Sequence, residues 1–519
     1  LGGHSLLFTR LANRLLKEFE NRLSLKYLFE TPTVYGQSLL LQKSLHTKLS
    51  VINPVKEQNG YILSSSQNRL WVLSQLQSSN LADFIQDDYS FEGELNVTAF
   101  EKAFESLIDR HEILRTVFKQ NDSGEIRQHV RNYSESGIKI NYLNFSSNID
   151  LNDKEKNVHE IIKEEASKPF DLVSGPLLRA YLIQTEDRKW IFCYTMHHII
   201  SDGWSVDVIV NDFMTLYNAY ANSESNPLVP LRIQYKDYAA WQQELIASDS
   251  LMQHKTYWND KFSSDIPVLE FPTDNPRPAI KTYNGDSLRL VLDKSISEKF
   301  RQLCRKEKST VFMGALASLN VLLYRYTQQN DIIIGIPVAG RNNTDLENQI
   351  GFYVNTLPIR SVFDETDSFV NVLNKISAST LEAFDYQDYP FDQLVDDLKL
   401  TRDLSRNPLF DVVLVSQGVD SENKSVITQE QELSINNYNT GDEYLTSKFD
   451  LVFKLREHLG LIYFDIDFNS DLFDKKTIKR VSGHLKELVK AITTDSNSEI
   501  RLLNFLSKAE KNKINLFID

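Results

Sequence analysis

Two adjacent histidines followed by an Asp-Gly pair are the residues of this chain whose types and spacing favour acid–base chemistry. His197 and His198 follow an apolar run at 190–195, and Asp202 and Gly203 come four and five residues after His198. An imidazole has an unperturbed pKa of about 6.5, which suits proton transfer near neutral pH. Neighbouring strand residues point to opposite faces, so one ring should face a cleft and the other the protein body. The string predicts a base at a cleft; the alternative is a buried, hydrogen-bonded histidine pair.

Metal and nucleophile chemistry have less support in the sequence. The two cysteines, Cys193 and Cys304, lie far apart, and neighbouring strand histidines diverge instead of converging on one ion. No serine or cysteine lies in a G-x-S-x-G elbow, so Ser201 and Ser205 are interpreted as turn and helix-cap residues. We therefore expect no metal site and no nucleophilic residue in this region.

A second candidate is Ser5, in the sequence Leu-Gly-Gly-His-Ser-Leu that opens the chain. The motif runs straight into a segment whose apolar residues recur at helical spacing, Leu7, Leu11 and Leu15 among them. Ser5 is therefore expected at a helix N-terminus, where free amide groups and the helix dipole favour a negatively charged substituent such as a phosphodiester. The alternative is that Ser5 only caps the helix.

The flanking patterns predict the elements that must position these residues. Apolar residues recur at helical spacing from Val206 to Tyr220, so the order around the histidines is strand, tight turn and helix. Further expected features are a helix begun by a capping box of Thr98 and Glu101, a helix at 34–42, strands at 287–293 and 432–435, a strand at 332–336 stopped by Pro337, and a polar insertion at 418–439. Mixed elements on both sides of a break at 222–230 predict an α+β fold with two lobes.

The composition restricts the class of protein. A chain of 519 residues is long enough for two or three domains, and 41% hydrophobic and 25% charged residues are typical of a globular protein. The net charge of -14 disfavours a nucleic-acid partner, which needs a basic face. No apolar run approaches the roughly 18 residues that span a bilayer. With no visible signal peptide and no disulfide framework, we expect a cytoplasmic protein that binds neither nucleic acid nor membrane.

The two motifs together resemble a fragment of a nonribosomal peptide synthetase, namely a partial peptidyl carrier protein followed by a condensation domain. In that family the serine of LGGHSL carries a phosphopantetheine arm, and HHxxxDG is the condensation signature. Six further segments resemble family motifs in the family's order: 64–71, 110–116, 235–241, 350–356, 387–392 and 402–409. The departures are mild: Ser66 replaces the usual alanine, Tyr353 a common phenylalanine, Tyr386 a common histidine or asparagine, and Asp392 a frequent glutamate.

The resemblance implies the fold and the order of domains. The expected fold is α+β, with two chloramphenicol-acetyltransferase-like lobes in a V and a tunnel open at opposite faces, preceded by part of a helical carrier bundle. The expected order is the C-terminal part of the carrier at 1–44 with Ser5 in it, a linker at 45–60, an N-terminal lobe at 61–225, a C-terminal lobe at 226–505, and a linker towards an adenylation domain at 506–519.

The implied chemistry is attack of the α-amine of a carrier-bound aminoacyl acceptor on a carrier-bound thioester donor, which forms an amide. His198 is expected beside the amine, and His197 is expected to orient the fold. Asp202 is expected to pair with Arg341 in a structural role, since a charge beneath a cleft needs a partner. The remaining expected site residues are Gly203 for backbone geometry and Asn355, Trp204 and Arg69 for the structure or lining of the channel.

The resemblance also implies a cofactor and partners. The cofactor is 4'-phosphopantetheine bound covalently to Ser5. The partners are the chain's own N-terminal donor carrier, a downstream acceptor carrier, adenylation domains of the same assembly line and a phosphopantetheinyl transferase. The carrier form GGHSL and the run from Asp202 to Ser205 resemble the condensing branch that accepts an L-configured donor.

Three alternatives share features with this interpretation. An epimerisation domain has the same fold and signature. A heterocyclising relative has aspartates in place of the paired histidines, so the intact pair at His197 and His198 disfavours it. A noncatalytic docking domain that recruits partner enzymes usually has a damaged motif.

Overall fold

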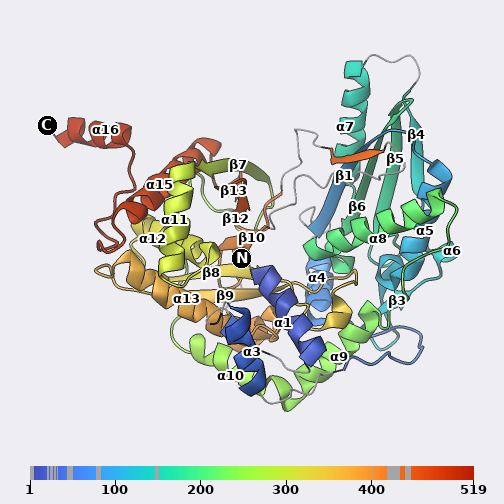
Figure 1. Cartoon of the computed structure of the whole chain (residues 1–519), viewed down its shortest axis with the longest axis horizontal. Helices are drawn as coiled ribbons and strands as arrows, with labels where there is room; N and C mark the ends of the chain where they lie inside the picture. Colours follow the sequence, from blue (N-terminus) through green and yellow to red (C-terminus); the bar gives the residue numbers. More distant parts are fainter. Residues whose placement is uncertain are drawn as a thin grey trace.

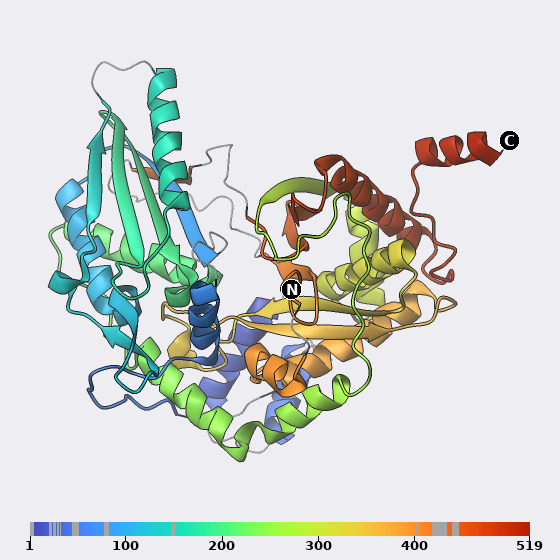
Figure 2. The same cartoon turned by 180° about the vertical axis from the view of Figure 1, so that it is seen from behind.

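The computed structural model describes residues 5–19, 23, 27–28, 31, 33–43, 51–76, 83–146, 151–400, 403–417, 433–438 and 446–518. Within them the chain forms two lobes that are joined at one end and diverge at the other, so the molecule has the outline of a V (Figure 1, and Figure 2 from behind). Each lobe is built on one large sheet. The mixed α+β architecture with two lobes, predicted from the sequence, is present.

The N-terminal lobe holds a five-stranded sheet ordered β11-β1-β6-β5-β4 among the described residues. Its strands are β1 (Phe84–Glu92), β4 (Ile140–Asn144), β5 (Leu178–Glu186), β6 (Lys189–His197) and β11 (Ser434–Asn437). Helices α5 (Val97–Arg110) and α8 (Gly203–Ala221) pack on one face, and α7 (Leu151–Ser167) packs on the other. The smaller elements of this lobe are β2 (Thr116–Gln120), β3 (Ile126–Val130) and α6 (Tyr133–Ser136).

Strand β6 is covered on both faces, which explains its continuous apolar sequence. Every residue from Trp190 to His197 is buried, because α5 and α8 lie over one face of the strand and α7 over the other. A strand covered on both sides needs apolar side chains at successive positions instead of alternate ones. The strand ends at His197, so it carries the histidine pair to the end of the sheet that lies next to the second lobe.

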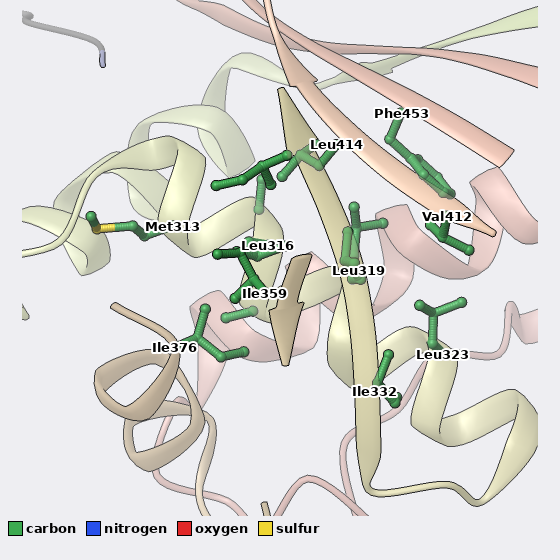
Figure 3. Close-up of a cluster of buried hydrophobic side chains, with 14 of the residues drawn as sticks. Met313, Leu316, Leu319, Leu323, Ile332, Ile359, Ile376, Val412, Leu414 and Phe453 are labelled. Carbon is green, nitrogen blue, oxygen red and sulfur yellow. The ribbon is translucent and has the colours of Figure 1, made fainter. Parts of the chain in front are cut away.

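The C-terminal lobe holds a six-stranded sheet ordered β7-β13-β12-β10-β8-β9 among the described residues. Its strands are β7 (Gly285–Leu292), β8 (Asp331–Val338), β9 (Asn355–Val362), β10 (Val412–Ser416), β12 (Leu451–His458) and β13 (Leu461–Asn469). Its helices are α11 (Lys294–Lys306), α12 (Val311–Thr327), α13 (Phe369–Asp385) and α15 (Lys475–Thr494). Figure 3 shows the core, where Leu316, Leu319 and Leu323 of α12 lie against strand residues such as Ile332 and Val412.

The remaining helices lie where the lobes join or at the ends of the chain (Figure 1). They are α1 (Ser5–Phe19), α3 (Val34–Lys43), α4 (Ser65–Leu76), α9 (Tyr235–Ala247), α10 (Met252–Lys261), α14 (Phe391–Leu398) and α16 (Lys508–Ile518). Helix α1 packs on the core of the C-terminal lobe through Leu11, Ala12 and Leu15. Among the helices of the described ranges, none combines the length and apolar content that a bilayer span requires.

Several expectations differ from the structure in detail. Asn96, not Thr98, caps α5, since its side chain accepts a hydrogen bond from the Ala99 amide at 3.0 Å. Pro337 does not end its strand, since β8 continues to Val338. Beyond Gly335, no β8 residue pairs with a described residue of β10. The missing amide of Pro337 therefore removes no hydrogen bond between β8 and β10.

The short strand expected at 432–435 lies at Ser434–Asn437, and it belongs to the other lobe. It pairs antiparallel with β1, with Phe91 opposite Ile435, so the segment 226–505 contributes a strand to the N-terminal sheet as well as forming the C-terminal lobe. The helix expected at 34–42 is present as α3, and the strand expected at 287–293 is present as β7. Most of the polar insertion at 418–439, and residues 45–50 of the expected linker, lie outside the described residues.

Candidate active site

The backbone changes from strand to 3-10 turn between the two histidines. Strand β6 ends at His197, and a 3-10 turn, η3 (His198–Ile200), begins at His198. His197 is buried, with its ring 5.7 Å from that of Phe84 and 6.1 Å from that of Phe170. Its Nδ1 accepts a hydrogen bond from the Ile199 amide at 3.0 Å. His197 thus holds the turn that presents its neighbour.

His198 is half-buried and has a defined tautomer. Its Nδ1 lies 3.2 Å from the carbonyl oxygen of Ser201, and its ring lies 5.9 Å from that of Phe352. A carbonyl oxygen only accepts, so the neutral ring carries its proton on Nδ1 and its lone pair on Nε2. No side chain or backbone group of the described residues hydrogen-bonds to Nε2. This atom can therefore accept a hydrogen bond from a substrate.

Burial keeps both imidazoles neutral. It lowers the pKa of His197 to about 4 and that of His198 to about 3, since a charged ring loses its solvation in the interior. The ammonium of Lys448 lowers both pKa values further, and the carboxylate of Asp83 acts in the opposite direction. A ring with so low a pKa is a weak base at pH 7, so the site is better suited to accepting a hydrogen bond than to complete proton removal.

Asp202 is buried at the N-terminus of α8 and accepts four hydrogen bonds. Its Oδ1 accepts from the Ser205 amide at 2.9 Å, from the Ser205 hydroxyl at 2.7 Å and from Arg341 Nη2 at 3.0 Å. Its Oδ2 accepts from the Tyr353 amide at 3.0 Å. Asp202 is 1% exposed, and the four donors occupy both of its carboxylate oxygens. Its contacts are those of a helix cap and an ion-pair partner.

Arg341 completes this arrangement from the C-terminal half of the sequence. Its side chain is 0% exposed, and Nη1 donates to the carbonyl oxygens of Leu346 at 2.5 Å and Gln349 at 2.6 Å. The guanidinium also lies 4.2 Å from the centre of the Tyr353 ring. The segment 341–353 is therefore folded around one cation, which ties it to the turn that follows the histidines.

Three other expected residues also link segments. The side-chain Nδ2 of Asn355 donates to the carbonyl oxygens of Gln387 at 2.9 Å and Tyr389 at 2.8 Å. Trp204 Nε1 donates to the Glu347 carbonyl at 3.0 Å. The remaining link is an ion pair at 2.9 Å between Arg69 of α4 and Asp392 of α14.

Gly203 has no evident backbone requirement. A Cβ added there would meet no described atom within 4 Å, and its φ lies outside the left-handed region. The expected need for glycine at this position is thus without a local explanation in the structure.

Sequence reasoning missed three polar residues of this region. Lys448 pairs with Asp83 at 3.1 Å across the lobes, and Asn13 of α1 donates to the Arg341 carbonyl oxygen at 2.8 Å and to the Glu347 carboxylate at 3.0 Å. No motif surrounds Asp83 or Asn13, so no sequence signal marked them. Ser5 is the first residue of α1, as expected, and its side chain lies outside the described atoms.

No group of three or more histidine, cysteine, aspartate or glutamate side chains in the described ranges is arranged to hold a metal ion. Cys193 and Cys304 are both buried and not disulfide-bonded.

Comparison with known proteins assigns the chain to a family. A family model described as "Condensation domain" matches residues 57–515. A linear gramicidin synthase of Brevibacillus parabrevis is 37% identical over 99% of this chain, and a plipastatin synthase of Bacillus subtilis (strain 168) is 36% identical over 98%. The chain spans 7% and 19% of the lengths of these two relatives.

A solved structure has the same fold. The X-domain in its complex with OxyB from teicoplanin biosynthesis superposes with a TM-score of 0.79 at 24% identity, over 89% of this chain and 99% of that one. Family model, relatives and fold agree, and the enzyme class expected from the sequence is confirmed at the level of the family. The chain therefore belongs to the condensation-domain family.

Proposed function

We propose that this chain forms peptide bonds in nonribosomal peptide synthesis. In the reaction, the α-amine nitrogen of a carrier-bound aminoacyl acceptor bonds to the carbonyl carbon of a carrier-bound donor thioester. The C–S bond breaks, and the proton lost by the amine neutralises the departing thiolate. The run from Asp202 to Ser205 supports an L-configured donor.

The observation that carries the proposal is the orientation of His198. Its Nδ1 is held by the Ser201 carbonyl, and its Nε2 has no hydrogen-bond partner among the described residues. An amine that donates a hydrogen bond to Nε2 would be held with its lone pair free to attack. A thioester is already activated, so orientation can supply much of the acceleration, with effective molarities of about 10⁵ M in favourable cases. The ion pair of Asp202 and Arg341 keeps the turn that bears His198 in place.

The domain order expected from the sequence belongs to this proposal. Residues 1–44 form the end of a donor carrier, and Ser5 carries 4'-phosphopantetheine, whose thiol holds the donor as a thioester. The position of Ser5 at the first residue of α1 fits a phosphodiester, because the helix N-terminus presents free amide groups. A phosphopantetheinyl transferase, an acceptor carrier and adenylation domains complete the set of partners.

The test is a condensation assay on the whole chain. Ser5 is loaded with an aminoacyl phosphopantetheine, a separately loaded acceptor carrier is added, and the carriers are analysed by mass spectrometry. The expected result is a dipeptidyl acceptor from the wild type and none from His198→Ala, with the mass of the loaded Ser5 peptide as the check on priming.

The same assay separates the alternatives. An epimerisation domain would leave every mass unchanged and alter only the configuration of the donor. A docking domain would yield no product and no change in configuration. Either outcome with a correctly loaded Ser5 would overturn the proposal.

A further inference from the structure

A cross-lobe ion pair lies next to the residue that packs against His197, and it takes no part in the proposed reaction. Asp83 immediately precedes β1 in the N-terminal lobe, and Lys448 lies just before β12 in the C-terminal lobe. Lys448 Nζ is 3.1 Å from Asp83 Oδ1. The next residue after Asp83, Phe84, is the register partner of His197 and packs its ring against the His197 ring. The pair therefore joins the two lobes at the point where β6 ends.

Both partners are held by ordered structure. The Lys448 carbonyl accepts hydrogen bonds from Lys281 Nζ and, at 3.2 Å, from Asn407 Nδ2, and the nearby Asp450 pairs with Arg277. On the other side, strand pairing fixes the backbone next to Asp83. An ion pair between two anchored segments constrains their separation more than one between flexible chains does.

We propose that Asp83 and Lys448 are a positioning pair for His198, which holds the two lobes at a fixed separation beside the ring and balances the charge that the ring meets. This inference rests on the proposed function of His198.

The two side chains differ in their exposure to solvent, so loss of one charge should not have the same effect as loss of the other. The side chain of Asp83 is 9% exposed, whereas that of Lys448 is 35% exposed. If Asp83 is replaced, water can still solvate Lys448. If Lys448 is replaced, the buried Asp83 carboxylate loses that ammonium, and its negative charge then favours the protonated form of the nearby imidazoles. Among the described residues, the charges that act on His198 are those of Lys448, Asp83 and His197, so a change at Lys448 or Asp83 should be felt by the two imidazoles.

Two single variants therefore break the same ion pair but should change the pH dependence of the rate differently. In Lys448→Met, the carboxylate that remains should raise the pKa of the imidazoles, and the acid limb of the pH–rate profile should move up by about 1–2 pH units. In Asp83→Asn only the ammonium remains, and it disfavours a protonated ring, so the acid limb should not move to higher pH. Both variants should lose condensation rate, on the order of tenfold or more, because the lobes are no longer held in place.

The control variants separate the effect of the charge on the histidines from the effect of losing the ion pair between the lobes. Lys454→Met removes the Lys454–Asp467 pair, whose side chains are 34% and 13% exposed and which lies within one sheet, so it should change neither the rate nor the profile. Lys448→Arg should keep the wild-type profile. The double variant Asp83→Asn with Lys448→Met should restore the acid limb while leaving the rate low.

A second measurement reads the same effect without turnover. Titration of the histidine ring ¹³C signals between pH 4 and 8, with the His198 signal assigned by its loss in His198→Gln, should show little protonation of His198 at pH 4 in the wild type and substantial protonation there in Lys448→Met. Identical acid limbs and titrations in Lys448→Met and Lys454→Met would overturn the inference. Absence of product from the wild type would instead overturn the proposed function, and the titration would still decide the inference.

Discussion

Replacement of Asp202 by alanine tests whether this residue holds the fold or takes part in the chemistry. The carboxylate accepts hydrogen bonds from Ser205, Tyr353 and Arg341, and both it and the guanidinium are almost fully buried, at 1% and 0% exposure. Alanine removes every one of these bonds and leaves Arg341 without its counter-charge. It also removes the cap of α8. We therefore expect a loss of stability first, with the loss of activity as its consequence.

The structure allows the size of this effect to be worked out. Loss of one partner of a buried ion pair costs about 3–5 kcal/mol, and loss of a helix cap costs about 1 kcal/mol. The two contributions share the same carboxylate, so we expect a total of about 4 kcal/mol rather than their sum. With an unfolding entropy of about 2.1 cal/mol/K per residue, this corresponds to about 10 °C if a lobe of roughly 200 residues unfolds alone, and to about 4 °C if both lobes unfold together.

Calorimetric unfolding and the condensation assay should be run on the same preparations. Lys475→Ala is the control, since its pair with Asp286 has a similar distance, 2.9 Å, but side chains that are 60% and 33% exposed, and its loss should cost less than about 1 kcal/mol. The double variant Asp202→Ala with Arg341→Met should lose less stability than the two single losses added together. An Asp202→Ala protein that unfolds at the wild-type temperature yet makes no product would assign Asp202 to the chemistry and refute this reasoning.

Three further predictions follow from the contacts of the site. His198→Ala should abolish the dipeptidyl product while lowering the free energy of unfolding by only about 1 kcal/mol, because the ring makes one hydrogen bond to a described residue, the Ser201 carbonyl; dipeptidyl product from a folded His198→Ala protein would contradict a role in the reaction. The folded state holds the pKa of His197 at about 4, below its unfolded value, so His197 contributes full stability above about pH 6.5 and loses it as the pH falls. His197→Gln should therefore flatten the pH dependence of unfolding between about pH 4 and 6.5, and an unchanged slope would count against the burial argument. Asn13→Ala should increase amide hydrogen exchange in α1 by about tenfold, since a buried hydrogen-bond donor to Arg341 is lost; unchanged exchange would mean that Asn13 does not hold the helix.

Features that depend on neighbouring residues could be predicted from the sequence. The apolar run before His197 and the helical spacing after Asp202 gave strand, turn and helix in the right order, because burial on both faces of β6 and the packing of α8 leave local patterns. The expected partner of Asp202 came from the family resemblance. Arg341 lies 139 positions away along the chain, a separation at which spacing carries no information.

Other features could not be predicted, for physical reasons. A strand of four residues such as β11 has too few side chains to specify its partner, and its pairing with β1 depends on the path of the chain between the lobes. The contact between Asn13 and the Arg341 carbonyl spans 328 positions, and the bond to a backbone atom leaves no trace in the residue type of its partner. Asp83 and Lys448 are ordinary charged residues in the sequence, and only the approach of the lobes makes them a pair.

The contrast between the two histidines follows from where the strand ends. Had β6 continued by one residue, the Nδ1 of His198 would have lost the Ser201 carbonyl that fixes its tautomer, because that contact depends on the 3-10 turn. This 3-10 turn depends on His197, whose Nδ1 accepts a hydrogen bond from the Ile199 amide. A ring whose pKa is held near 3 by burial is unsuited to carry a proton at pH 7, yet it is a neutral acceptor at all working pH values. An amine that attacks an activated thioester needs its lone pair aimed more than it needs a strong base, so low basicity and fixed orientation at His198 serve the same purpose.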